Sequence, residues 1–201
     1  MDFLKYERKY WVKGIKYVAG IDEAGRGPLA GPVVAASVVF DSDVILPGVN
    51  DSKKITSKKR EELYPLIMTE AISVGIGVVN EDVIDDINIL QATFLAMKKS
   101  IANLIIKPEQ IIVDGPHSDI KQFSVECIID GDRKSHSIAA ASIIAKVLRD
   151  NEMIILDSIL KVYGFANHKG YGTKEHMMAI DIFGPSVYHR FSFSPLNDRK
   201  F

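Results

Sequence analysis

The stretch YVAGIDEAGRGPLAGPVVAASVVF, residues 17–40, sets the order of the fold and contains its most informative residues. Residues 16–22 place apolar side chains around small ones, which predicts a strand. Residues 32–40 form a run rich in valine, which predicts a strand buried on both faces. Residues 24–31 carry three glycines and a proline, so we expect an irregular loop between the two strands.

Helices and strands alternate along the rest of the chain. Further strands are expected at residues 72–79, 110–114 and 124–129. Helices are expected at residues 51–64, at 81–104, from about 137 to 149 with more helix to 163, and from an N-cap at Thr173 to Gly184-Pro185. This order predicts an α/β fold with a mixed five-stranded sheet flanked by helices. We expect one domain over residues 1–201, with a helical C-terminal part at about 151–201.

Two of these helices carry specific predictions. Thr56 or Ser57 should cap the first of them, and Pro65 should end or kink it. The helix at 81–104 should present one apolar face to a sheet. The residues expected on that face are Ile87, Leu90, Phe94, Met97, Ile101 and Leu104.

The composition excludes several classes of protein. The 201 residues carry 25 Lys and Arg against 26 Asp and Glu, and 47% of them are hydrophobic. This balance excludes a disordered chain and binding of nucleic acid by overall charge alone, so any such binding must use local patches. The single cysteine, Cys127, excludes a disulfide framework. The charged N-terminus and the absence of a run of about 20 apolar residues indicate a cytoplasmic protein with no membrane segment, which we expect to be a monomer.

Acidic residues stand at the ends of three expected strands. Asp22 and Glu23 follow the first strand, Asp114 ends the fourth, and Asp132 follows the fifth. Carboxylates that meet at one sheet edge repel one another, and hard divalent ions such as Mg²⁺ or Mn²⁺ neutralise them. Two such ions can activate a water and stabilise the leaving oxygen of a phosphodiester. On these residues alone, a metal site and a set of ordinary turn-forming acids are both open.

Several motifs, in the correct order, resemble those of the ribonuclease HII family. The motifs that carry the resemblance are residues 17–34, Asn50-Asp51-Ser52-Lys53-Lys54, Val113-Asp114-Gly115, Gly131-Asp132 with residues 137–150, His168-Lys169-Gly170-Tyr171-Gly172-Thr173, and His189-Arg190 with Ser192-Phe193. The resemblance covers nearly the whole chain. It implies an RNase-H-like sheet, a divalent metal, and an endoribonuclease that hydrolyses the RNA strand of RNA–DNA hybrids. It also implies cutting at ribonucleotides embedded in duplex DNA, 5′ to the ribonucleotide, leaving 3′-hydroxyl and 5′-phosphate ends.

The resemblance assigns roles residue by residue. The acids Asp22, Glu23, Asp114 and Asp132 would form the metal-binding, catalytic quartet of a two-metal mechanism. The residues Gly25, Arg26, Gly27 and Tyr171 would recognise the ribonucleotide. Three departures from the family pattern bear on substrate binding. Pro65 lies in a helix, Phe191 breaks a basic run, and the chain ends soon after Pro195.

Basic residues supply candidate phosphate contacts. Lys53 belongs to a group of five cations at residues 53–60, where a solvated helix face is the alternative. Lys146 and Arg149 are three residues apart and should share one helix face toward phosphate, although a surface pair with Asp150 or Glu152 is also open. His168 and His176 lack a further soft ligand and do not indicate a zinc site.

Two other functions remain open at this stage. One is a metal-dependent DNA nuclease or strand-transfer enzyme on the same kind of sheet, which would ignore the 2′-hydroxyl. The other is a binding module for hybrids that does not cut. For Tyr171, the alternative to substrate recognition is an ordinary amphipathic residue that opens the last helix.

Overall fold

A computed structural model describes residues 2–42, 44–50, 52 and 55–198. Five strands in the described chain form one mixed sheet in the order β3-β2-β1-β4-β5, which confirms the expected sheet. The strands are β1 (Val18–Ala24), β2 (Val33–Val39), β3 (Ser73–Val79), β4 (Gln110–Asp114) and β5 (Val125–Ile128). The pairs β1–β2 and β2–β3 are antiparallel, whereas β1–β4 and β4–β5 are parallel.

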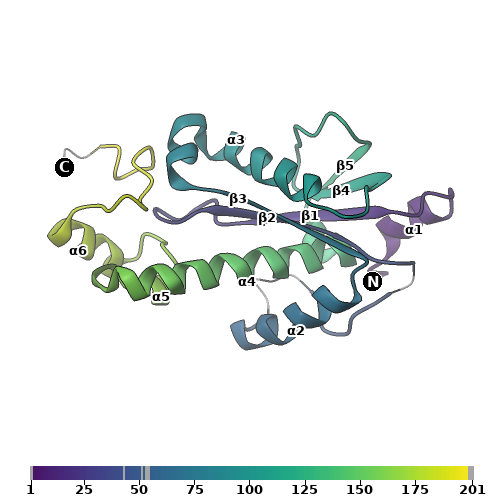
Figure 1. Ribbon diagram of the computed structural model, residues 1–201, viewed down its shortest axis with the longest axis horizontal. Helices are drawn as coiled ribbons and strands as arrows, with labels where there is room; N and C mark the ends of the chain where they lie inside the picture. Colours follow the sequence, from purple (N-terminus) through teal and green to yellow (C-terminus); the bar gives the residue numbers. More distant parts are fainter. Residues whose placement is uncertain (1, 43, 51, 53–54, 199–201) are drawn as a thin grey trace.

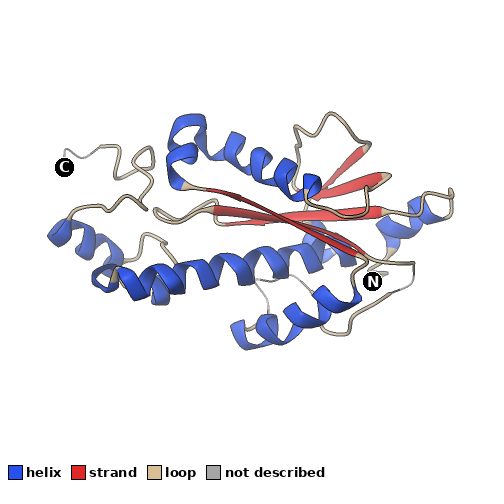
Figure 2. Ribbon diagram, viewed as in Figure 1, coloured by secondary structure: helices blue, strands red, loops and turns tan. Residues whose placement is uncertain are grey.

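Helices cover both faces of the sheet, as Figures 1 and 2 show. They are α1 (Lys5–Trp11), α2 (Ser57–Glu70), α3 (Glu81–Ala102), α4 (His136–Ile159), α5 (Phe165–His168) and α6 (Lys174–Phe183). Helix α3 lies on one face and the long helix α4 on the other, with α2 packed beside α4 (Figure 1). Helices α5 and α6 gather at one end of the molecule and α1 at the other (Figure 1). No helix among the described residues is long and apolar enough to cross a bilayer.

Strand β2 is buried along its whole length, as its continuous apolar sequence predicts. Val33, Ala35 and Val39 pack in the core under α3, whereas Val34, Ala36 and Val38 pack in the core under α4. This alternation is the period of two that a strand imposes, with an apolar layer on each side.

Helix α4 approaches β1 very closely. A Cβ atom on Gly20 would overlap the backbone of Ser137, so glycine is required for this contact. The close approach brings the side of α4 directly beneath the acidic end of β1.

The sequence predicts that Pro65 ends or kinks its helix. The helix does not end there, so that half of the prediction is wrong. Helix α2 begins at Ser57, where the Thr56 hydroxyl accepts a hydrogen bond from the Lys59 amide at 3.2 Å, and it continues past Pro65 to Glu70. Leu63 and Ile67 are fully buried on either side of the proline. Their packing against α4 and β2 keeps the helix in place where sequence alone predicts its end.

Helix α3 is interrupted where a continuous apolar face was expected. Asn88 has a positive φ of 67°, and its Oδ1 accepts hydrogen bonds from the amides of Leu90 and Gln91, so it caps the second part of the helix. Leu90 is 44% exposed and does not belong to the apolar face, whereas Phe94 is buried.

Sequence analysis did not predict helix α1. It is held by Glu7, a buried carboxylate that accepts hydrogen bonds from the hydroxyls of Ser135 and Ser137 and from the Ser137 amide. A charged residue on a short N-terminal segment gives no period that would reveal this burial.

Candidate active site

Three carboxylates meet at one edge of the sheet. Asp22 comes from β1, Asp114 ends β4, and Asp132 lies in a 3₁₀ turn, Gly131–Arg133, that follows β5. One oxygen from each of the three lies within 4.8 Å of the others. The parallel pairing of Ile21 with Val113 brings the first two acids side by side. The expected convergence of these acids is therefore confirmed.

Backbone amides orient Asp22 and Asp114. The Gly131 amide donates to Asp114 Oδ1 at 2.6 Å, which ties the 3₁₀ turn to the end of β4. The Glu23 amide donates to Asp22 Oδ1 at 2.7 Å. The carboxylates are thus held at fixed positions by the chain itself, before any ligand binds.

The electrostatics of this cluster favour a bound cation. Burial raises the pKa of Asp22 well above its ordinary value, and the negative charges of Glu23 and Asp114 raise it further. The hydrogen bond from the Glu23 amide acts in the opposite direction and does not cancel them. An all-oxygen donor set with excess negative charge fits a hard divalent ion such as Mg²⁺ or Mn²⁺.

Glu23 lies beside this cluster and outside the group of three. Its Oε1 is 3.3 Å from Nη1 of Arg26, three residues further along. It also lines a hollow next to the acids. Glu23 therefore connects the acidic cluster with the loop that follows β1.

The hollow has a volume of about 520 Å³ and collects most of the residues expected to contact substrate. Those lining it are Gly25, Arg26, Gly27, Lys146 and Tyr171, together with Glu23, Ala24, Ser52, Ile89 and Ser142. The Tyr171 side chain is 45% exposed. Its Cε1 atom would lie 3.6 Å from a Cβ on Gly27, so the ring lies against the loop where glycine leaves it room. Lys53 lies outside the described residues.

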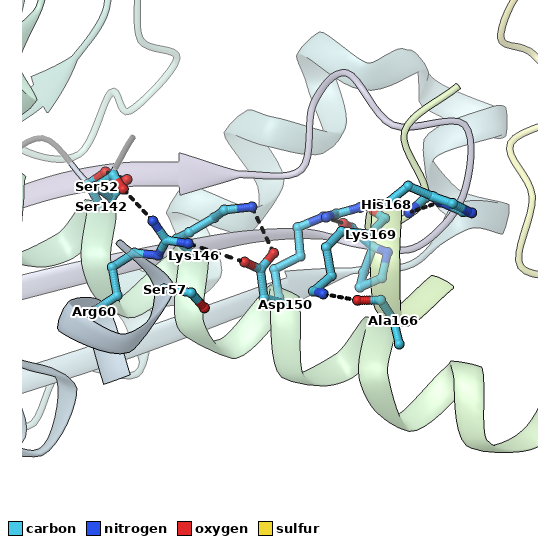
Figure 3. Close-up of polar contacts among 12 residues, drawn as sticks. Ser52, Ser57, Arg60, Ser142, Lys146, Asp150, Ala166, His168 and Lys169 are labelled. Carbon is cyan, nitrogen blue, oxygen red and sulfur yellow. Dashed lines mark hydrogen bonds and ion pairs between the residues drawn. The ribbon is translucent and has the colours of Figure 1, made fainter. Parts of the chain in front are cut away.

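Lys146 lines the hollow and also forms an ion pair. Its Nζ is 2.7 Å from Oδ1 of Asp150, one helical turn further along α4, which confirms the surface pair that the sequence left open. Asp150 also faces Arg60 at 3.8 Å, and Figure 3 shows it between the two cations. The Arg60 guanidinium in turn donates to the carbonyl of Ser52 at 2.7 Å, and the Ser52 hydroxyl contacts that of Ser142 on α4.

Arg149 does not face phosphate, and that prediction is corrected. Its side chain is fully buried and donates to the carbonyls of Pro32, Ala30 and Lys169 at 3.0–3.1 Å. Spacing along α4 placed it correctly near Lys146. The sequence did not show that the β1–β2 loop (residues 25–32) covers this turn of the helix.

Arg190 is a residue of the site to which sequence analysis gave no role. It is fully buried and donates to four carbonyls of the β1–β2 loop, those of Gly25, Arg26, Pro28 and Gly31. Burial, together with the nearby charge of Arg149, lowers its pKa to about 9. The only available signal was its position in the His189-Arg190 motif. The two arginines together fix the loop from beneath.

A second cavity, of about 550 Å³, lies away from the acids. Its walls come from the end of α3, from Lys107 and Pro108 before β4, and from residues 119–123 before β5. It therefore stands at the other end of β4 and β5 from Asp114. None of the residues expected to carry function lines it, and it takes no part in the site.

Comparison with known proteins gives one consistent result. A sequence model of the family described as Ribonuclease HII matches residues 19–194. The Ribonuclease HII of Acholeplasma laidlawii is 49% identical over 196 residues, covering 98% of this chain and 96% of that protein. That of Caldicellulosiruptor bescii is 50% identical over 192 residues, covering 96% and 93%. The crystal structure of ribonuclease H2 from Pyrococcus horikoshii superposes with a TM-score of 0.74 at 28% identity, covering 90% of this chain and 96% of that one.

Proposed function

Because the chain belongs to the ribonuclease HII family, and is thus a metal-dependent ribonuclease H acting on RNA–DNA hybrids, we propose that it also cuts at single ribonucleotides in duplex DNA. The bond cut is the phosphodiester 5′ to the ribonucleotide, and the products carry 3′-hydroxyl and 5′-phosphate ends. The observation that carries this proposal is the position of the acidic cluster beside a hollow lined by Gly25, Gly27 and Tyr171.

Asp22, Asp114 and Asp132 would hold two divalent ions, with Glu23 at their side. When bound, Mg²⁺ or Mn²⁺ neutralises the acids, activates a water and stabilises the leaving oxygen. The protein's own contribution is to hold the carboxylates close together in a buried place. The amides of Glu23 and Gly131 do this without adding charge.

The β1–β2 loop and Tyr171 would recognise the sugar. RNA differs from DNA by the 2′-hydroxyl, which both donates and accepts hydrogen bonds. The two glycines let backbone groups approach that hydroxyl closely. The exposed Tyr171 ring would pack on the following sugar, where a deoxyribose leaves more room. This combination supports a preference for the junction between RNA and DNA.

Buried positive charge beneath the loop would attract the phosphate backbone. Arg149 and Arg190 lie under residues 25–32, and Lys146 and Arg26 line the hollow above. A positive field focused on one cleft raises the local concentration of an anionic substrate. This local charge would serve a protein whose net charge is only −1.

The test compares three substrates with the same sequence: duplex DNA with one ribonucleotide, a uniform RNA–DNA hybrid, and all-DNA duplex. We expect cleavage of the first two only with Mg²⁺ or Mn²⁺, and mapping of the ends should place the cut 5′ to the ribonucleotide. The control is Asp114→Asn, which should bind and not cut.

Two results would favour the other functions. Equal cutting of the all-DNA duplex would indicate a DNA nuclease that ignores the 2′-hydroxyl. Binding to the hybrid without any metal-dependent cutting would indicate a binding module.

A further inference from the structure

Three histidines form a buried cluster next to the backbone of Tyr171. His168, His176 and His189 are each 9% exposed or less, and the rings of His168 and His176 stack at 4.5 Å between centroids. The ring of Phe165 packs against all three. The cluster joins the end of α5, the start of α6 and the segment after α6.

The partners of His189 and His176 fix where their protons lie. The Ser186 amide donates to Nδ1 of His189 at 2.9 Å, so that nitrogen carries no proton and Nε2 carries one. Nδ1 of His176 lies 3.0 Å from the carbonyl oxygen of Tyr171, which can only accept, so this nitrogen is protonated. Nε2 of His176 is therefore an acceptor. It lies 3.0 Å from the protonated Nε2 of His189, so His189 donates this hydrogen bond and His176 accepts it.

The result is a chain of hydrogen bonds with a single direction. It runs from the Ser186 amide through His189 and His176 to the Tyr171 carbonyl. Both rings must be neutral for this chain to form. The nitrogens of His168 are also engaged, with the Gly170 amide and the Tyr163 carbonyl. The ring nitrogens of the cluster are thus occupied by hydrogen bonds, which does not suit a metal site.

The chain ends on the residue that would recognise the sugar. The Tyr171 carbonyl accepts from His176 and also from the Thr173 amide at 2.8 Å, and the Tyr171 amide donates to the His168 carbonyl. The neighbouring Gly170 carbonyl accepts from Leu29 of the β1–β2 loop at 2.8 Å. The peptide groups on both sides of Tyr171 are therefore fixed, and this sets where the exposed ring stands over Gly27.

We propose that His176 is a positioning residue for junction recognition: its Nδ1–H, oriented by His189, holds the Tyr171 carbonyl and so places the ring over the β1–β2 loop. This inference rests on the proposed function. It is distinct from a packing role, because it depends on one hydrogen bond from one ring nitrogen. It assigns no part in the bond-breaking step to either histidine.

Two substitutions separate the hydrogen bond from the packing. In His176→Asn, the amide nitrogen stands where Nδ1 stood and can still donate to the Tyr171 carbonyl, while the contact with His189 is lost. In His176→Gln, the amide oxygen reaches the position of Nε2 and still accepts from His189, while the donor to Tyr171 is lost. The measurement is the ratio of kcat/KM on the single ribonucleotide to kcat/KM on the uniform hybrid.

We expect His176→Asn to keep the parent's ratio within about twofold and His176→Gln to lower it by about tenfold, the usual scale for one lost hydrogen bond. A matched control is His136→Gln, at the other end of the site's helix. His136 is equally buried, and its Nε2 accepts from the Leu46 amide at 3.2 Å, far from Tyr171. It should lower the melting temperature and leave the ratio unchanged.

The proposal is overturned if the two His176 variants show the same ratio as each other, whether or not that ratio differs from the parent's. The Nδ1 donor would then make no difference.

A second measurement does not depend on cleavage. In the free protein, ¹⁵N NMR should show His176 with its proton on Nδ1, and the Gly172 amide should shift in His176→Gln and stay in place in His176→Asn. The opposite tautomer would also overturn the proposal. If the parent cuts neither ribonucleotide substrate, the proposed function fails, and a normal NMR result would show that the histidine chain exists without that role.

Discussion

Two groups of like charge lie close to the β1–β2 loop, and their surroundings in the fold are opposite. Asp22, Asp114 and Asp132 face one another, and the pKa of Asp22 is raised by burial and by the charges of Glu23 and Asp114. Arg149 and Arg190 also carry like charges, yet backbone carbonyls surround both guanidiniums. The chain thus places hydrogen-bond acceptors around the two arginines, whereas it brings the acids together with like charge. The acids are therefore suited to bind ions from solution, and the arginines to fix a shape.

The largest effect should come from the acidic group. Asp114→Asn should reduce cleavage by about a thousandfold or more, because the loss of ion binding removes several kcal/mol of transition-state stabilisation. The metal-free protein should melt at an unchanged or higher temperature, since one repulsive charge is gone. Cleavage assays and thermal melting in the presence of EDTA check both parts. A large drop in melting temperature would show that the acid is structural.

The pH dependence of stability tests whether the ionised acids destabilise the metal-free fold. The folded pKa of Asp22 is raised, so its ionised form costs stability in the metal-free fold. The cost is absent below the unfolded pKa of about 3.9 and grows as pH rises above it. Asp22→Asn should therefore stabilise the metal-free protein at pH 7 and lose that advantage near pH 3.5.

The next effect concerns the arginine group. Arg190→Met should destabilise the fold by about 3 kcal/mol or more, because four buried carbonyls lose their donor. The matched control is Arg26→Met, an exposed side chain whose ion pair with Glu23 should contribute less than about 1 kcal/mol. Urea denaturation measures both. Similar losses in the two variants would remove the distinction between the two arginines.

The acidic half of this comparison could be predicted from the sequence, and the arginine half could not. Asp22 and Asp114 lie at the ends of apolar strands and Asp132 follows another. The parallel pairing of β1 with β4 leaves little choice about where they meet. Arg149 shares the spacing of Lys146 but not its surroundings. Helical spacing fixes the direction of a side chain and not what covers it, and the cover here comes from a loop more than a hundred residues earlier.

The same limit explains the errors in the fold. Pro65 removes one helical hydrogen bond, a local cost that the sequence shows. The burial of Leu63 and Ile67 outweighs it, and that burial depends on α4, far along the chain. Asn88 is a related case, since its positive φ and its cap are local but no flanking glycine or proline marks the break.

A smaller effect on stability should appear at acidic pH, and it should come from the buried histidines. Burial lowers the pKa of His176 and of His189 to about 4, so both stay neutral in the fold. Their contribution to stability is complete above the unfolded pKa of about 6.5 and is lost as pH falls toward 4. His176→Asn should flatten the dependence of unfolding free energy on pH in this interval. An unchanged slope would mean that His176 is already charged in the fold.

The smallest effect should be the response of stability to metal. Mg²⁺ or Mn²⁺ at ten times its Kd should stabilise the fold by about 1.4 kcal/mol, because the ion binds the folded cluster and not the unfolded chain. For a domain of this size, that corresponds to a rise of roughly 3–5 °C in Tm. Calorimetry should show this rise in Arg26→Met and not in Asp114→Asn. A rise in both would place the ion elsewhere.

The contact between Arg190 and Gly25 also bears on the order in which the protein is completed. The two residues are 165 positions apart in the chain. During synthesis, β1, β4 and the turn that holds Asp132 all leave the ribosome before Arg190 is made, so the acidic cluster can assemble first. The β1–β2 loop gains its anchor only when the segment after α6 docks. A nascent chain can thus acquire the groups that bind metal before it acquires the shape that selects a substrate.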